Sequence, residues 1–173
     1  TETIVGQQSY GYREGARSYA LFQNIHGFAQ INSTNIAIVD TGNACLRMLN
    51  RKTYTTSRLA GVCTSAGNVN GKSGKFNNPW GVVLDPLDPN KLFVTDYSNG
   101  ALRSVEISTG EISTVLTGLR YPRGLSWSSD KSSLFITNTN YISKATFDTN
   151  TSAVDNVILA GSTSSGYKEG PFI

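Results

Sequence analysis

The chain has 173 residues, of which 38% are hydrophobic and 16% charged, a composition typical of a folded domain and not of a disordered chain. Ser, Thr and Asn number 20, 18 and 15, and because their side chains hydrogen-bond nearby backbone and favour turns, a helical bundle is excluded. The net charge of +3 comes from Lys and Arg spread along the chain without a run, which indicates neither a nucleic-acid groove nor a basic membrane-binding patch. No apolar stretch reaches the roughly 18 residues of a membrane-spanning helix.

Short runs rich in Ile, Val, Leu, Phe and Thr, separated by Gly, Asn, Asp and Pro, predict strands joined by tight turns. They fall into three groups of four along the chain. The predicted strands are 27–31, 36–39, 45–49 and 54–60, then 80–84, 91–95, 101–107 and 111–117, then 124–126, 133–137, 141–147 and 153–159.

The three groups are copies of one repeat. Three polar positions of the first copy recur 56 residues later in the second, and each of the three copies closes with Leu-Ala-Gly or Leu-Thr-Gly. The third copy is shorter, has Asn138 in place of Asp and lacks the aligned Arg. The recurring polar residues are Asp40, Asn43 and Arg47 in the first copy and Asp96, Asn99 and Arg103 in the second. Four antiparallel strands in a repeat of about 40–55 residues are the blade of a β-propeller. A sandwich of unrelated strands is the alternative.

These positions resemble the repeats of the NHL-repeat β-propeller family, in its extracellular form. The first copy matches with Glu14, Gly15, Ala20, Phe22, Asp40, Asn43, Arg47 and Gly61, and the second with Gly71, Phe76, Pro79, Gly81, Asp96, Asn99, Arg103 and Gly118. Two positions depart from the pattern, because Ile25 replaces a Pro and Asn70 replaces an acidic residue. The resemblance implies an all-β propeller; it implies no particular function, because propellers host many.

The repeats predict the domain organisation of residues 1–173. Residues 11–61, 67–118 and 119–161 are expected to form three blades, residues 1–6 the closing strand of a preceding blade, and residues 166–173 the start of a following one. Three blades cannot close a ring, so we expect part of a six-bladed propeller. Further residues, a second fragment or another copy of the chain would complete it.

The strand order assigns the loops to two faces. Loops between the first and second, and the third and fourth, strands of a blade share one face, which carries two N-glycosylation sequons, at Asn32 and Asn150. Cys45 begins one strand and Cys63 follows its antiparallel neighbour, so both are expected on the opposite face. The sequence therefore predicts a disulfide, with two independent buried thiols as the alternative. A disulfide and glycans would indicate an extracellular or cell-surface protein.

Structural roles are predicted for the repeated polar residues. Asp40, Asp96 and Asn138 end the second strand of each blade and are expected to accept backbone N–H bonds in the following turn. Arg47 and Arg103 are expected to pair with a neighbouring carboxylate in that turn. The tryptophans, Trp80 and Trp127, are expected to pack between blades unless they face the central channel.

Little in the sequence indicates catalysis or RNA binding. A zinc-dependent lyase needs several His ligands, but His26 is the only histidine. A calcium site could draw on Asp85, Asp130, Asn32 and Asn35, whose spacing fits turn chemistry equally well. An RNA-binding face would be basic, yet acidic residues share the relevant side. The basic residues there are Lys72, Lys75, Arg120, Arg123 and Lys168, and the acidic ones are Glu14 and Glu169.

The sequence thus favours an extracellular scaffold that binds or assembles, without evident catalytic activity and without a cofactor or metal. Its expected partners are a protein or glycan ligand, or further copies or segments of the propeller, but neither nucleic acid nor inserted membrane. One alternative is a propeller enzyme, a lyase or metal-dependent hydrolase, whose catalytic residues lie mostly in blades outside this chain. The other is a structural subunit of an extracellular polymer, because exposed strand edges are templates for pairing.

Overall fold

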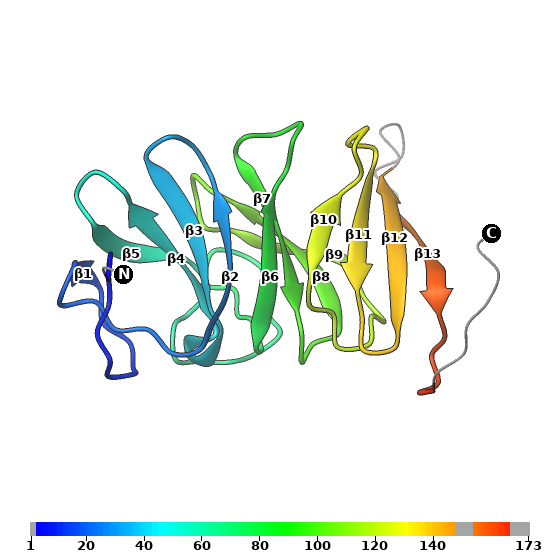
Figure 1. Cartoon of the computed structure of the whole chain (residues 1–173), viewed down its shortest axis with the longest axis horizontal. Coiled ribbons are helices and arrows are strands. Elements are labelled where there is room, and N and C mark those ends of the chain that lie inside the picture. The colour runs from blue at the N-terminus through cyan, green and yellow to red at the C-terminus, as the bar shows by residue number, and fades with distance from the viewer. Residues whose placement is uncertain (1–2, 148–153, 167–173) are drawn as a thin grey trace.

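The computed structural model describes residues 3–147 and 154–166, whose regular secondary structure is β-strand apart from one 3-10 turn (Figure 1). The first group of strands is β1 (Gly15–Ala16), β2 (Ile25–Gln30), β3 (Asn35–Asp40), β4 (Cys45–Asn50) and β5 (Thr55–Ala60), with the 3-10 turn η1 (Thr41–Asn43) between β3 and β4. The second is β6 (Pro79–Leu84), β7 (Lys91–Asp96), β8 (Ala101–Glu106) and β9 (Ile112–Leu116). The third is β10 (Leu125–Trp127), β11 (Ser133–Thr137), β12 (Tyr141–Phe147) and β13 (Val154–Gly161).

Each group forms its own antiparallel meander. The sheet orders are β1-β5-β4-β3-β2, β6-β7-β8-β9 and β10-β11-β12-β13, so chain neighbours are sheet neighbours, apart from the β1–β5 pair. The three sheets stand side by side in one row and do not close into a ring (Figure 1). Consecutive blades of a propeller have this arrangement.

The predicted strands and the observed ones differ by a few residues at most, with two exceptions. The two-residue strand β1 was not predicted; it adds a fifth strand to the first sheet by pairing with β5. Residues 3–6 do not form the expected closing strand. The Gly6 N–H instead donates one hydrogen bond to the Arg17 carbonyl (2.9 Å). A strand needs a ladder of several such bonds to a neighbouring strand.

The core lies between adjacent sheets. Alternate side chains of β7 point to opposite sides, as the pleat of a strand requires. Leu92 and Val94 pack with the first sheet and Phe93 packs with the third. The middle sheet is therefore buried on both faces.

Glycines in the innermost strands allow the sheets to approach closely. A Cβ on Gly27 of β2 would lie 2.7 Å from the Trp80 carbonyl oxygen, and one on Gly81 of β6 would collide with the Arg123 carbonyl oxygen. Any larger residue would push the sheets apart, so backbone contact through glycine sets the spacing of the inner strands.

Candidate binding surface

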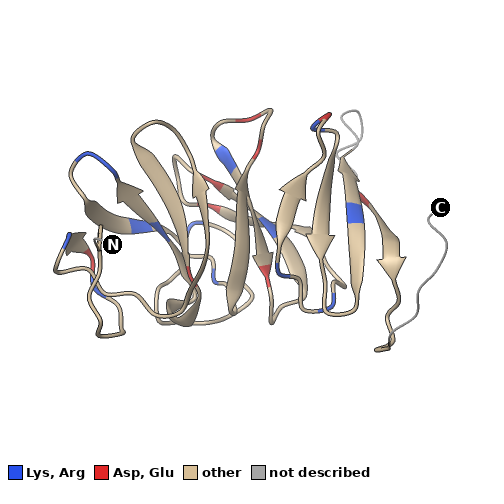
Figure 2. Ribbon diagram, viewed as in Figure 1, with Lys and Arg blue, Asp and Glu red and all other residues tan. Residues whose placement is uncertain are grey.

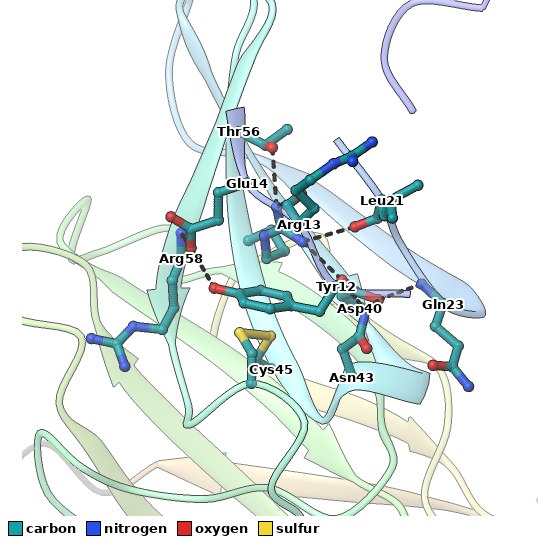
Figure 3. The surroundings of a disulfide bond; sticks show 12 residues. Tyr12, Arg13, Glu14, Leu21, Gln23, Asp40, Asn43, Cys45, Thr56 and Arg58 are labelled. Atoms are coloured by element: carbon teal, nitrogen blue, oxygen red, sulfur yellow. Dashed lines mark hydrogen bonds and ion pairs between the residues drawn. A yellow bond between two sulfur atoms is a disulfide. The ribbon is translucent and has the colours of Figure 1, made fainter. Parts of the chain in front are cut away.

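The first repeat is held together by a buried cluster of charged and polar side chains (Figure 3). Arg47 Nη1 lies 3.1 Å from Asp40 Oδ2, and both side chains are fully buried. Asp40 also accepts hydrogen bonds from the Gln23 N–H and from Asn43 Nδ2. Asn43 donates in addition to the Gly11 carbonyl, and Arg47 Nη2 to the Arg13 carbonyl. The cluster therefore ties the loop that precedes β1 to the turn between β3 and β4.

The second repeat builds the same cluster. Arg103 Nη1 lies 2.8 Å from Asp96 Oδ2, again with both side chains fully buried, and Asn99 donates to Asp96 and to the Gly67 carbonyl. Arg103 also binds Asn70, at the position that departs from the family pattern (2.6 Å). In both repeats, burial raises the pKa of the Asp carboxyl, Asp40 or Asp96, while hydrogen bonds from Asn, Arg and a backbone N–H oppose that shift.

The third repeat replaces the ion pair with a neutral one. Ser143 pairs with Ile136 across the sheet, as Arg47 pairs with Ile38 in the first sheet, so Ser143 stands where the other repeats have Arg. Asn138 Nδ2 donates to its hydroxyl (3.1 Å). A register shift falls beside this position in all three sheets. The turn after Asn138 is two residues shorter, which hides the equivalence from alignment by spacing.

The disulfide predicted between Cys45 and Cys63 is confirmed, with a Cα–Cα distance of 5.0 Å. It joins the start of β4 to the segment after β5, and Cys45 is the cross-strand partner of Asp40 (Figure 3). Next to it is a shallow pocket lined by Tyr12, Glu14, Ser57, Arg58, Val62 and Cys63. Glu14 accepts from the Tyr12 hydroxyl and from the Arg58 N–H, so its carboxylate is engaged within the fold.

The residues considered for calcium take part in turns. Asp85 Oδ1 accepts from the Leu87 N–H, and Asn32 Oδ1 accepts from the N–H groups of Thr34 and Asn35. Asp130 accepts from Ser128 and Ser132, which lowers the pKa of its carboxyl to about 2. In residues 3–147 and 154–166, no three His, Cys, Asp or Glu side chains are grouped so as to hold a metal ion.

A row of aromatic rings crosses all three sheets at the start of the innermost strands. His26 in β2 stacks on Trp80 in β6, with ring centroids 3.7 Å apart and an interplanar angle of 24°. Trp80 is followed by Tyr97, 5.4 Å away, and Tyr97 by Tyr121, 5.1 Å away. The guanidinium of Arg123 lies 5.0 Å from the centre of the Trp80 ring and 5.4 Å from that of Tyr97. We call these five residues the aromatic row.

Inter-sheet packing explains why these residues meet. His26, Trp80 and Arg123 each precede the inner-strand glycine of their repeat, at Gly27, Gly81 and Gly124. The glycines bring neighbouring backbones into contact, so the side chains just before them are brought together as well. The starts of β2, β6 and β10, and the turn between β7 and β8, lie at the lower edge of Figure 1. His26, Tyr121 and Arg123 are exposed, while Trp80 and Tyr97 are partly buried.

Hydrogen bonding assigns the tautomer of His26. The single hydroxyl hydrogen of Thr41 is donated to the Pro79 carbonyl (2.6 Å). The 3.0 Å contact between His26 Nδ1 and Thr41 Oγ1 therefore has Nδ1–H as the donor. In the neutral ring, Nε2 is left as a hydrogen-bond acceptor.

Trp127 differs from Trp80 in its surroundings. It packs with Phe93 and Phe147 in the core between the second and third sheets, and its Nε1–H donates to the Leu84 carbonyl (2.9 Å). Packing thus accounts for Trp127, in agreement with the sequence analysis. Trp80 has no hydrogen bond from its Nε1–H to any residue in the described part of the chain.

Lys and Arg are distributed over the strands and turns of all three sheets (Figure 2). Lys75 donates to the Ser65 hydroxyl, and Arg120 donates to the Thr163 carbonyl. Lys168, Glu169 and the sequon at Asn150 lie outside the described residues. Within the described ranges, no helix is long and apolar enough to cross a membrane.

No family model and no curated protein matches the chain. Solved structures resemble it: a chain of a nidogen/laminin complex has a TM-score of 0.61 at 15% identity, covering 84% of this chain and 51% of its own. A functionally unknown protein from Desulfotomaculum acetoxidans DSM 771 has a TM-score of 0.55 at 16% identity, covering 80% and 43%. An auxiliary nutrient binding protein from Bacteroides thetaiotaomicron VPI-5482 has 0.51 at 13%, covering 96% and 50%.

These likenesses and the sheet topology together establish the β-propeller fold. The chain spans about half the length of these solved structures. At such identities the likeness concerns the fold alone, so the binding surface rests on this chain's own residues. The aromatic row was not predicted from the sequence. Its one trace there is that His26, Trp80 and Arg123 each precede the inner-strand glycine of their repeat.

Proposed function

We propose that this chain is a segment of an extracellular NHL-type propeller that binds a partner through the aromatic row and has no catalytic role. The observation that carries the proposal is the row itself, in which side chains of three separate sheets form one partly exposed surface. Trp, Tyr and Arg are the residues enriched where protein interfaces concentrate their binding energy. The repeated Asp, Asn and Arg clusters are used internally, which leaves the row as the candidate surface.

Two further observations support the setting. The buried cluster of each of the first two repeats uses the positions that match the NHL pattern, and the disulfide is a bond that persists in oxidising compartments. Two of the similar folds come from a nidogen/laminin complex and from a nutrient binding protein, which suits a propeller that binds.

Binding through the row is tested by surface plasmon resonance against a panel of purified extracellular proteins and oligosaccharides. The variant Tyr121→Ala is expected to lower the affinity for the ligand about tenfold, because truncation of an interface aromatic residue has an effect of this size. The matched control is Leu87→Ala, which removes another exposed apolar side chain from the turn between β6 and β7. A ligand lost with Leu87→Ala and retained with Tyr121→Ala would refute the use of this surface.

The extracellular setting has a separate test. Asn32 lies in the exposed turn between β2 and β3, where its side chain hydrogen-bonds the two residues that follow Ser33. After expression through a eukaryotic secretory pathway, we expect enzymatic deglycosylation to lower the intact mass, with a smaller loss in Asn32→Gln. An unchanged mass would count against glycans on this face.

One observation favours assembly as a second function. Val157, Ile158 and Leu159 of β13 are exposed by 59%, 43% and 48%, whereas Leu59, the counterpart of Leu159 in the first sheet, is buried. A further segment or copy of the propeller would cover this strand. Light scattering after gel filtration is expected to show association that Ile158→Lys weakens; a monomer at all concentrations would exclude association of copies.

A further inference from the structure

We propose that the aromatic row recognises a carboxylate on an acidic segment of a protein partner, with Arg123 as the anchoring cation. This inference rests on the proposed function, since it names the class of ligand for the same surface.

The guanidinium of Arg123 is available to bind a partner. In the described residues, its guanidinium contacts the rings of Trp80 and Tyr97 and makes no ion pair or hydrogen bond. Arg47 and Arg103, in contrast, spend theirs on buried carboxylates. The two rings hold the guanidinium plane in place, and an Arg held in this way loses little freedom when it binds a carboxylate with two parallel hydrogen bonds.

Other donors stand beside it. The Trp80 Nε1–H and the hydroxyls of Tyr97 and Tyr121 have no hydrogen-bond partner in the part of the chain that the structure describes. All three belong to rings in contact with one another or with Arg123. Several convergent donors and a cation suit an anionic acceptor.

Among residues 3–147 and 154–166, no carboxylate forms an ion pair with Arg123. Asp40 and Asp96 end the strands next to the row, but both are fully buried and bound to Arg47 and Arg103. The surface around Arg123 thus keeps its positive charge, which steers an acidic partner and disfavours a basic one.

The way the rings stack favours a peptide over a sugar. Trp80 comes from the middle sheet, with His26 from the first sheet and Arg123 from the third against its ring. His26 and Arg123 thus already contact the Trp80 ring within the protein, whereas a saccharide that stacks on an indole needs an open face. What the row offers to a partner is ring edges, N–H and O–H groups and the guanidinium, which suit an acidic side chain and the apolar residues beside it.

The test uses the full chain with its Trp indoles labelled with ¹⁵N. The chain has two tryptophans, so two indole signals are expected, assigned with Trp80→Phe. The probes are acetylated hexaglutamate amide, its neutral hexaglutamine counterpart and a heparin hexasaccharide. We expect hexaglutamate to shift the Trp80 signal and leave the Trp127 signal in place, and hexaglutamine to shift neither.

Three variants separate the specific contact from net charge. Arg123→Gln is expected to lower the affinity for hexaglutamate about tenfold or more. Arg123→Lys is expected to lower it less, because Lys keeps the charge but cannot form the bidentate hydrogen bonds of Arg. Arg51→Gln removes the same charge from the exposed turn between β4 and β5, on the opposite face, and is expected to bind as the unaltered chain does. An unmoved Trp127 signal shows that each variant is folded.

Each adverse result has a distinct meaning. If the heparin hexasaccharide shifts Trp80 and hexaglutamate does not, the surface takes acidic glycans and the inference is wrong. Equal weakening by Arg51→Gln and Arg123→Gln would reduce the effect to net charge and overturn it as well. A partner that depends on Tyr121 but is neutral would leave the proposed function standing and refute only the acidic ligand.

Discussion

The imidazole of His26 lies against the indole of Trp80 with the ring centroids 3.7 Å apart, although the two residues belong to different sheets. The glycines that follow them explain this contact, because Gly27 touches the Trp80 backbone and Gly81 touches that of Arg123. The same glycine contacts that pack neighbouring blades therefore also bring the residues of the aromatic row together.

Gly81→Ala tests this coupling. The added Cβ would meet the Arg123 carbonyl oxygen, a backbone atom that cannot move without shifting β10. We expect a loss of about 1–3 kcal/mol in the free energy of unfolding, measured in urea, as for other overpacked sites. The indole signal of Trp80 should also move, while Ser113→Ala, on the exposed side of β9, should change neither. A stable Gly81→Ala chain with an unmoved Trp80 signal would contradict the coupling.

Arg103→Met tests the buried ion pair of the second repeat. It leaves the Asp96 carboxylate without its cation, and we expect a loss of about 3–5 kcal/mol in the free energy of unfolding. The double variant Asp96→Asn with Arg103→Met should lose less, because no uncompensated charge remains, just as the third repeat uses the neutral Asn138–Ser143 pair. Lys91→Met, which breaks only the partly exposed ion pairs with Asp85 and Asp88, serves as the control. A double variant as unstable as Arg103→Met would show that charge burial is not the cause.

Sequence alone predicted the strands and the disulfide, because both follow from local patterns: alternating turn and β-forming residues, and cysteines at neighbouring strand ends. It missed β1, since two residues carry no periodicity. It missed the role of Ser143 because a shorter turn changes the spacing from Asn138. The aromatic row stayed hidden for a different reason: its members become neighbours only when the sheets pack, a relation that no local pattern encodes.

Removal of the disulfide should lower stability without abolishing the fold. The bond closes a loop between positions 18 residues apart, for which the restriction of the unfolded chain is worth about 3 kcal/mol. The double variant Cys45→Ser with Cys63→Ser is expected to lose roughly this much in urea unfolding, and the unaltered chain should lose a similar amount when reduced. Blocking with iodoacetamide before reduction should label no thiol in the unaltered chain. Free thiols there would contradict the bond.

The pH dependence of stability should contain a contribution from Asp130. Hydrogen bonds from Ser128 and Ser132 lower the pKa of its carboxyl from 3.8 to about 2 in the folded chain. Because the pKa is lowered on folding, the ionised form of Asp130 stabilises the fold. This contribution is present above pH 3.8 and is lost as the pH falls toward about 2. Burial raises the pKa of Asp40 and Asp96, whose contribution has the opposite sign and is lost as the pH rises through their folded pKa. The variant Asp130→Asn retains Asp40 and Asp96, so the difference in Tm between the unaltered chain and this variant isolates the contribution of Asp130. Measured by circular dichroism, this difference should shrink toward acid pH. A difference that stays constant with pH would contradict the lowered pKa of Asp130.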